Sequence, residues 1–270
     1  MSAADLRALL AADHLTHAPG VYDPASTALA VRAGHRAVHL SGAAVAATML
    51  GRPDLGFGSA TQIADRAATL AGALGGVPLL ADADIGFESP DHAVWTALAY
   101  QRAGISGVCL ADDEDVERSA ARIAAMAGQV PAITLIVQVR GRDMAEIVER
   151  CRAYVAAGAH AVLPAVGDEA ADLGRVRDAL PGVPLVVSRS ETATGGTRLT
   201  DAELAGLGVR LVLHPLAAVL AALRAASLVY RSILEEGHAE RVDRLPLGAF
   251  ATLTEPAEGA ATRGIDRIDT

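Results

Sequence analysis

Lysine is absent from this sequence, and all 23 basic residues are arginine. A catalytic Schiff base on a lysine side chain is therefore excluded. Basic runs are absent as well, and the net charge of −9 argues against a nucleic-acid partner, because such partners need a basic face to neutralise their phosphates. Cysteine is scarce. Cys109 and Cys151 fit no metal-ligand spacing, and we expect both to be reduced and buried.

The sequence lacks a recognisable export signal and a long apolar run. An acid, Asp5, stands near the start, and no apolar core with a small-residue cleavage site follows it. The longest apolar stretch, 211–223, is shorter than the ~20 residues that cross a bilayer, and Arg224 follows it. We therefore expect a soluble, cytoplasmic protein with no membrane partner, whose 51% hydrophobic residues fill a large core.

Short apolar runs alternate with amphipathic stretches along most of the chain. The runs predict eight strands, at 18–22, 37–42, 78–84, 107–112, 132–139, 161–166, 184–188 and 210–215. Helical patterns lie between them, at 61–74, 91–103, 115–127, 144–157, 169–180 and 201–207. Eight such units predict an α/β fold, a (β/α)8 TIM barrel over residues 1–238, followed by an irregular arm over 239–270. A doubly wound open sheet is the alternative, but no G-x-G-x-x-G follows the first strand.

Two carboxylates stand on alternate positions where the third apolar run ends. Side chains two apart on a strand share a face, so Asp82 and Asp84 are expected to converge. Like charges at the end of a buried strand are costly unless a cation balances them, which favours a Mg²⁺ or Mn²⁺ site. The alternative is that both aspartates cap the next helix or accept loop N–H bonds.

Further polar residues follow the other strands, and in a barrel these ends meet at one mouth. Asp112 is assigned to the metal together with Asp82 and Asp84, although N-capping of the next helix and compensation of its dipole explain acids in this position more often than catalysis does. The His at the end of the eighth strand is either a proton carrier or a hydrogen-bonded rim residue. The remaining candidates are divided between substrate binding (Tyr22, Ser41, Gly42, Ala43) and catalysis (Asp54, Gln138, Arg140, Ser188, His214).

Several segments together resemble the isocitrate lyase/phosphoenolpyruvate mutase superfamily, most closely its short, methylisocitrate lyase-like members, from about residue 15 to about residue 237. They are Pro19-Gly20-Val21-Tyr22-Asp23-Pro24-Ala25-Ser26, Leu40-Ser41-Gly42-Ala43, Arg52-Pro53-Asp54-Leu55-Gly56, Ala81-Asp82-Ala83-Asp84-Ile85-Gly86 and Val212-Leu213-His214-Pro215. The resemblance implies a barrel whose eighth helix is exchanged between subunits, commonly in a dimer of dimers. It also implies Mg²⁺ beside Asp84 with Asp82 and Asp54 in its outer shell, and a 2-oxo or 2-hydroxy acid whose carboxylate is held by the Ser41-Gly42-Ala43 backbone.

This chain departs from the superfamily pattern at positions that carry its chemistry. Where the superfamily has I-E-D after the fourth strand, this chain has Leu110-Ala111-Asp112, and the Lys-Lys-Cys-Gly-His lid is missing. Other replacements put Gln138 where an Arg clamps substrate, Ala165 in place of a Glu and Ser188 in place of an Asn. Since a lost arginine clamp and an open site both weaken the parent reaction, we expect little or no cleavage of methylisocitrate or isocitrate.

Three functional interpretations follow. The first is a divergent Mg²⁺-dependent lyase-type enzyme, carbon–carbon or phosphonomutase-like, that acts on a small 2-oxo or 2-hydroxy acid through an enolate-like intermediate. The second is an inactive, metal-binding relative, and the third is a different general-base activity on the same barrel. A wide apolar face over residues 216–236 also predicts a homo-oligomer, either a dimer or a tetramer, unless this helix simply packs on its own barrel.

Overall fold

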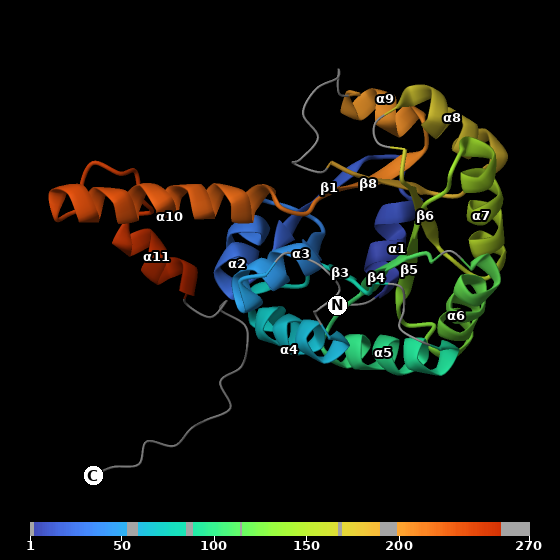
Figure 1. Ribbon diagram of the computed structural model, residues 1–270, viewed down its shortest axis with the longest axis horizontal. Coiled ribbons are helices and arrows are strands. Elements are labelled where there is room, and N and C mark those ends of the chain that lie inside the picture. The colour runs from blue at the N-terminus through green and yellow to red at the C-terminus, as the bar shows by residue number, and fades with distance from the viewer. Residues whose placement is uncertain are drawn as a thin grey trace, which may run out of the picture.

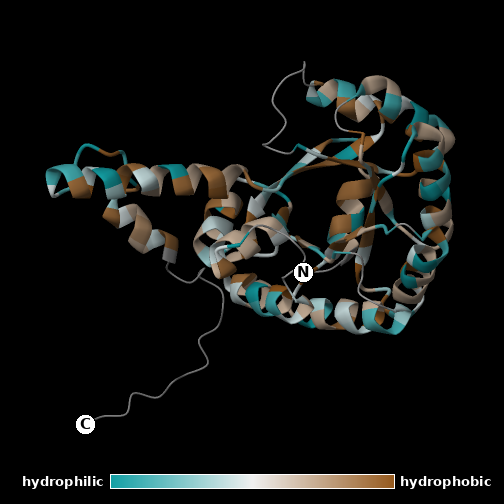
Figure 2. Cartoon of the chain, in the orientation of Figure 1, coloured by the Kyte–Doolittle hydropathy of each residue, from teal (hydrophilic) through white to brown (hydrophobic). Residues whose placement is uncertain are grey.

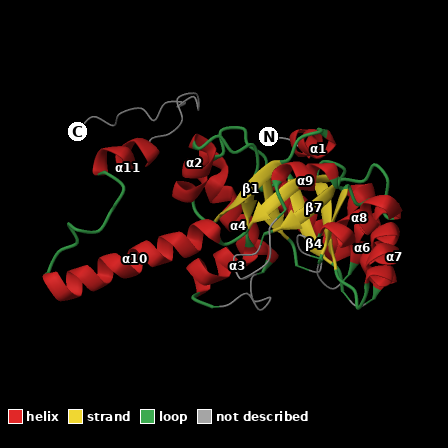
Figure 3. Ribbon diagram, turned by 90° about the horizontal axis from the view of Figure 1, so that it is seen from above, coloured by secondary structure: helices red, strands yellow, loops and turns green. Residues whose placement is uncertain are grey.

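The computed structural model describes residues 3–52, 59–84, 89–113, 115–166, 169–189 and 199–254. All eight predicted strands are present, and each pairs in parallel with its neighbours to close a barrel in the order β1 to β8 (Figures 1 and 3). Their bounds are β1 Thr16–Val21, β2 Val38–Leu40, β3 Leu79–Asp82, β4 Gly107–Ala111, β5 Thr134–Val139, β6 Ala161–Pro164, β7 Leu185–Ser188 and β8 Val209–His214. The predicted TIM barrel is confirmed.

Helices surround the strands, and most begin at a side-chain cap. They are α2 Pro24–Arg32, α3 Gly42–Val45, the π-helical turn Ala46–Leu50, α4 Ala60–Leu70 with the 3₁₀ turn Ala71–Ala73, α5 Pro90–Arg102, α6 Val116–Gln129, α7 Met144–Ala156, α8 Ala170–Ala179 and α9 Asp201–Gly206. Asp115 and Asp143 each accept a backbone N–H of the first turn of α6 and α7, which satisfies donors that a helix start leaves without intrahelical partners.

Alternate residues of each strand face either the barrel interior or the outer helices. Inward side chains form one apolar cluster, which includes Ala18, Ala37, Leu80, Cys109, Ile136, Ala161, Leu163, Val186, Leu211 and Leu213. The residues between them, such as Val108 and Leu110, belong to the larger cluster packed against the helices. This alternation decides which polar side chains at the strand ends reach the interior.

Helix α1 (Ala3–Ala11) covers the amino-terminal end of the barrel. Leu6, Leu9 and Leu10 join the interior cluster from this helix. A Cβ on Gly107, the first residue of β4, would lie 2.4 Å from Leu6 Cδ2, so only glycine lets α1 approach this closely. The opposite end, where the strands terminate, is left for the candidate site.

Two C-terminal helices extend away from the barrel (Figures 1 and 3). Helix α10 (Ala217–Glu236) is apolar along much of its length (Figure 2) but only 11% buried over its most apolar window, and it exposes Leu220, Leu223, Ile233 and Leu234. By length and composition alone, α10 is long and apolar enough to cross a membrane, although the apolar run expected from the sequence ends before Arg224. The arm predicted as irregular contains α11 (Leu247–Thr254), an eight-residue apolar segment that forms a helix.

Candidate functional site

A small pocket at the carboxyl end of β3 contains both carboxylates of the D-x-D pair. Asp82 and Asp84 line it with Gly42, the apolar residues of α3 and the following π-helical turn, and Gln62 and Ile63 of α4. Its volume of about 20 Å³ matches a single small ion or water molecule. Asp84 adopts a φ of 41°, a left-handed conformation that Asp tolerates better than most residues. Both residues of the predicted pair therefore line one pocket, and their role as metal ligands stays a prediction.

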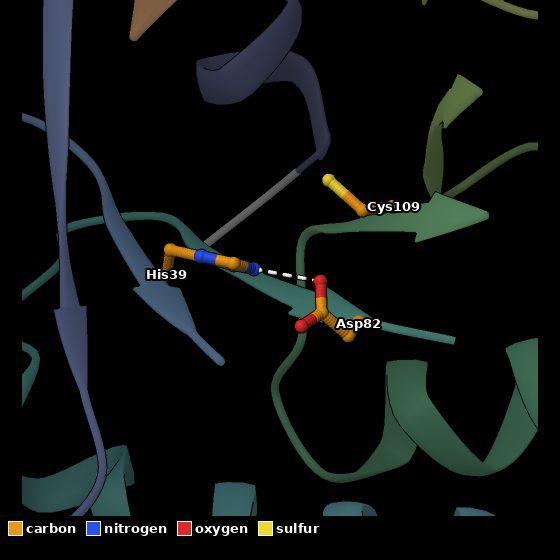
Figure 4. A group of neighbouring side chains, drawn as sticks. All are labelled: His39, Asp82 and Cys109. Atoms are coloured by element: carbon orange, nitrogen blue, oxygen red, sulfur yellow. Dashed lines mark hydrogen bonds and ion pairs between the residues drawn. The ribbon is translucent and has the colours of Figure 1, made fainter. Parts of the chain in front are cut away.

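The Asp82 carboxylate has two partners within the barrel mouth. Its Oδ1 lies 2.9 Å from His39 Nε2 (Figure 4). Its Oδ2 accepts the Gly42 N–H at 2.8 Å. Burial raises the pKa of Asp82, but the neighbouring His39 and the two hydrogen bonds outweigh this effect and hold the pKa below its usual value. An ionised carboxylate offers about four acceptor positions, so each oxygen of Asp82 retains acceptor capacity.

Two donor sets can be compared as metal ligands. His39, Asp82 and Cys109 place one nitrogen, one oxygen and one sulfur within 4.8 Å of one another (Figure 4), a mixture that suits zinc better than magnesium. Burial raises the pKa of the Cys109 thiol well above its ordinary value, so in the absence of a metal ion this group is a neutral thiol. The carboxylates of Asp82 and Asp84 form an oxygen-only set, and this set fits Mg²⁺.

The segment predicted to hold a substrate carboxylate follows β2. The Ser41 hydroxyl caps α3 by accepting the Ala44 N–H at 3.4 Å, and Ser41 is buried. The Gly42 N–H is directed to Asp82, which corrects the expectation that it binds substrate. The Ala43 N–H lies in the first turn of α3, where amides have no intrahelical acceptor, and is left for that role.

Tyr22 stands one residue beyond β1 and is half-buried. Its backbone N–H donates to Ser26 Oγ at 3.1 Å, and burial, together with the adjacent Asp23, raises the pKa of its phenol. A phenol with a raised pKa stays protonated near neutral pH and can act as a hydrogen-bond donor. Tyr22 is not among the residues that line the Asp82–Asp84 pocket.

Gln138 and Ser188 reach the barrel interior. Gln138 pairs in register with Leu163, and Ser188 with Leu213, and both leucines face inward. Since register partners in a parallel sheet share a face, the two polar side chains point into the barrel near its mouth. Both are half-buried and neutral, and they stand at the ends of β5 and β7. Their predicted roles are compatible with this placement and remain predictions.

Asp112 is placed differently from Asp82. Ala111 pairs with the inward-facing Gln138, so Asp112 turns to the outside, where it contacts α7. Its carboxylate accepts the Arg140 N–H, a bond from Arg150 Nη1 at 3.1 Å and one from the Tyr154 hydroxyl at 3.3 Å. Burial raises the pKa of Asp112 in spite of these donors. Such a fully engaged carboxylate does not support the metal-ligand assignment, because Asp112 lies in a separate pocket from Asp82 and Asp84.

Arg140 lines that second pocket together with Asp112, Asp113 and Arg150. Its guanidinium is exposed at the end of β5. The β4–α6 connection beside it is short: β4 ends at Ala111 and α6 begins at Val116, as expected from the missing lid. Arg140 therefore stands at the open edge of the mouth, outside the pocket formed by Asp82 and Asp84.

His214, the last residue of β8, follows the inward Leu213 and so faces outward. Its Nε2 lies 2.9 Å from His17 Nδ1, and His17 Nε2 lies 3.0 Å from Asp201 Oδ2. The predicted place of His214 at the catalytic mouth is corrected by this arrangement, which makes it a hydrogen-bonded residue of the barrel exterior.

Asp54 lies outside the described residues, so its predicted role is neither supported nor contradicted. His39 was missed by the sequence reading, although it contacts Asp82 directly. A signal for it was available. His39 lies between two apolar residues of a short buried strand, where a polar side chain needs a partner.

The closed barrel and the acidic pocket at the carboxyl end of its third strand place this protein among the (β/α)8 barrels. In such barrels the functional site lies at the carboxyl ends of the strands. The profile of the phosphoenolpyruvate phosphomutase family matches residues 6–234. The chain belongs to this family, within the isocitrate lyase/phosphoenolpyruvate mutase superfamily.

Characterised relatives and solved structures agree with this membership. 2-Methylisocitrate lyase of Escherichia coli (strain K12) is 32% identical over 252 residues, which cover 86% of this chain and 84% of that protein. The structure of 2,3-dimethylmalate lyase superposes with a TM-score of 0.85 at 25% identity and covers 94% of each chain. Phosphonopyruvate hydrolase, solved with oxalate and Mg²⁺, gives a TM-score of 0.83 at 26% identity and covers 94% of this chain and 95% of its own.

These relatives include lyases and a hydrolase, which supports lyase-type chemistry in general and no single substrate. The expectation of little or no methylisocitrate cleavage is not borne out, since the Escherichia coli relative is itself a 2-methylisocitrate lyase.

Proposed function

We propose that this protein is a Mg²⁺-dependent, lyase-type enzyme that acts on a small 2-oxo or 2-hydroxy acid through an enolate-like intermediate. The observation that carries the proposal is the pocket in which Asp82, Asp84 and Gly42 meet at the barrel mouth. Its oxygen ligands suit a hard cation, and a relative of the same fold was solved with Mg²⁺ and oxalate.

Each residue near the pocket has a role that follows from its position. Asp84, exposed and lining the pocket, would hold Mg²⁺ together with the acceptor capacity left on Asp82. Bound Mg²⁺ supplies a Lewis acid that chelates a 2-oxo carboxylate and stabilises negative charge on its oxygen. His39 and the Gly42 N–H fix the orientation of Asp82. The Ala43 N–H supplies a neutral donor for the substrate carboxylate.

The interior of the mouth also favours a substrate with few charges. Gln138 and Ser188 are neutral, and they present hydrogen-bonding groups where a guanidinium would pair with a second carboxylate. Arg140, at the outer edge, is a candidate cation for an additional anionic group at the end of β5. This arrangement supports a compact 2-oxo or 2-hydroxy acid.

A substrate panel tests the proposal. The purified protein is assayed with Mg²⁺ against 2-methylisocitrate, 2,3-dimethylmalate, oxaloacetate and phosphonopyruvate, with product acids identified by chromatography. We expect Mg²⁺-dependent turnover of at least one acid, abolished in Asp84→Asn and retained in Asp178→Asn, a change at an exposed aspartate of α8. Absence of turnover across the panel in a protein that binds Mg²⁺ would instead favour the inactive, metal-binding alternative.

We also propose that a second copy of this chain covers α10. Several apolar side chains of α10 are exposed, and Leu234 is 86% exposed. A contiguous exposed apolar face of this kind marks a surface that another protein chain covers. Light scattering coupled to size exclusion tests this. We expect a dimer or a tetramer for the parent and for the control Arg152→Glu on α7, and a smaller species for the double variant Leu223→Glu/Leu234→Glu.

A further inference from the structure

A second cavity lies at the opposite end of the barrel from Asp82 and Asp84. Its volume is about 630 Å³, within the range of small-molecule sites. Arg7 of α1, Arg177 of α8 and Arg210 of β8 line it, together with His160, which precedes β6. Three arginines from three separate elements, one of them the covering helix α1, thus line one cavity at the amino-terminal end of the barrel.

Backbone carbonyls hold these arginines in place. Arg7 Nη2 donates to the carbonyls of Pro131 and Ile133 at 2.6 and 2.8 Å. Arg210 Nη1 donates to the carbonyls of Ala205 and Val209 at 2.9 and 3.1 Å. A carbonyl positions a guanidinium but does not neutralise it, so positive charge remains at the cavity.

Carboxylates compensate this charge only in part. Asp13, the one carboxylate among the described residues that line the cavity, is fully exposed to solvent and lies 3.5 Å from Arg210 Nη2. Arg177 pairs at 2.7 Å with Asp178, which is 70% exposed. Arg7 has no carboxylate partner among residues 3–52, 59–84 and the other described segments, and its buried Nε has no hydrogen-bond partner there. The cavity wall is therefore cationic and donor-rich.

His160 adds a neutral donor to the same wall. Its Nδ1 accepts the Leu135 N–H at 3.0 Å, which leaves the proton on Nε2. Burial and the charge of Arg7 lower the pKa of His160 to about 4. The ring is therefore uncharged near neutral pH, and its Nε2–H is available for an acceptor.

We propose that the cavity lined by Arg7, Arg177, Arg210 and His160 binds a small polyanion carrying two or more carboxylate or phosphate groups. Guanidinium groups form bidentate, charge-assisted hydrogen bonds with both kinds of oxyanion, and their spread over α1, α8 and β8 suits a ligand with separated charges. The bound anion would link the covering helix α1 to the far side of the barrel and stabilise the folded state. This site is separate from the Asp82–Asp84 pocket.

Calorimetric titration and thermal unfolding test the proposal, without Mg²⁺ and at constant ionic strength set with NaCl. The probes are inorganic phosphate, pyrophosphate and citrate. We expect pyrophosphate or citrate to bind and to raise the melting temperature. Tighter binding of pyrophosphate identifies a phosphorylated ligand, and tighter binding of citrate identifies a carboxylate ligand. The double variant Arg177→Gln/Arg210→Gln should weaken binding about 100-fold, because each lost ion pair between a guanidinium and the anion costs about tenfold in affinity.

Matched variants separate this site from other effects. Asp84→Asn, which removes a carboxylate at the opposite mouth, and Arg152→Gln on α7 should both bind the anion like the parent. His160 provides a second readout, because a bound anion should raise its pKa from about 4 in an NMR titration. Equal stabilisation by NaCl alone, or binding that survives Arg177→Gln/Arg210→Gln, would overturn the proposal.

Discussion

The acidic residues after β3 and those after β4 look alike in sequence but have different surroundings. Asp82 and Asp84 share a small pocket, and the described partners of the Asp82 carboxylate are His39 and one backbone amide. Asp113, by contrast, pairs with Arg122 at 2.8 Å and with Arg118 at 3.0 Å. Arginine side chains engage the carboxylate of Asp113, whereas the described contacts of the Asp82 carboxylate leave acceptor positions that a metal ion can use.

Strand alternation produces this difference. Asp82 ends β3 on its inward face, where the interior offers no arginine among the described residues. Asp112 follows the inward Ala111 and is directed to α7, where Arg150 and Tyr154 reach it. The first acid is thus available for ligand chemistry, while the second stabilises the contact between β4 and α7.

The largest expected effect is on stability, at Asp112. Replacing Asp112 by Ala removes acceptors from the Arg140 N–H, Arg150 and Tyr154 in a buried setting and should cost about 3 kcal/mol of unfolding free energy. Urea denaturation measures this cost. Mg²⁺ binding in the same variant should match the parent, and a loss of metal affinity without a loss of stability would reverse the roles given to the two acidic pairs.

The converse change is at Asp84. Asp84→Asn should weaken Mg²⁺ binding on the order of 100-fold, because it removes a charged oxygen ligand from the pocket. Unfolding free energy should stay within ~0.5 kcal/mol of the parent, since the side chain is exposed and Asn also tolerates a positive φ. Calorimetric titration with MgCl₂ gives the affinity. An unchanged dissociation constant would contradict the assignment.

Asp82 is expected to affect both properties moderately. Asp82→Asn weakens the contacts with His39 and the Gly42 N–H, which should cost about 1 kcal/mol of stability. It should also reduce Mg²⁺ affinity about tenfold. Denaturation and titration of this single variant sharpen the comparison, because an effect on only one of the two properties would show that Asp82 belongs wholly to the fold or wholly to the metal site.

The smallest effect concerns pH. Arg122, the Asp115 N–H and Arg118 outweigh the burial of Asp113 and hold its pKa below the usual value. A lowered folded-state pKa means that this stabilisation is present above the unfolded pKa and is lost as pH falls through the folded value. Asp113→Asn should therefore lose less stability than the parent as the pH falls below about 4, measured as the urea midpoint. Parallel curves for the two proteins would contradict this.

The barrel was predictable from the sequence because its signals are local. Apolar runs mark all eight strands, and a side-chain cap precedes most of the helices that follow them. Helix α11 was missed because a short segment with one Gly and no apolar periodicity resembles an irregular arm. Likewise, α10 is longer than the apolar run 211–223 suggests, because the helix continues through Arg224 and Arg231.

The site was only partly predictable because the inward or outward direction of a strand end depends on register. Asp82 and Asp84 are separated by one residue, so their convergence could be inferred. Whether Asp112 or Ala111 faces the interior, and whether Leu213 or His214 does, is decided by pairing with β5 and β7. The use of the Gly42 N–H by Asp82 is a contact between distant segments, and no local pattern encodes it.

A crystal structure grown with Mn²⁺ and oxalate tests the central claim most directly, because anomalous scattering locates the ion without ambiguity. We expect one strong anomalous peak beside Asp84 and Asp82, with oxalate bound to the ion on the side of Ala43. A peak at Asp112 and Asp113, or none at either acidic pair, would contradict it.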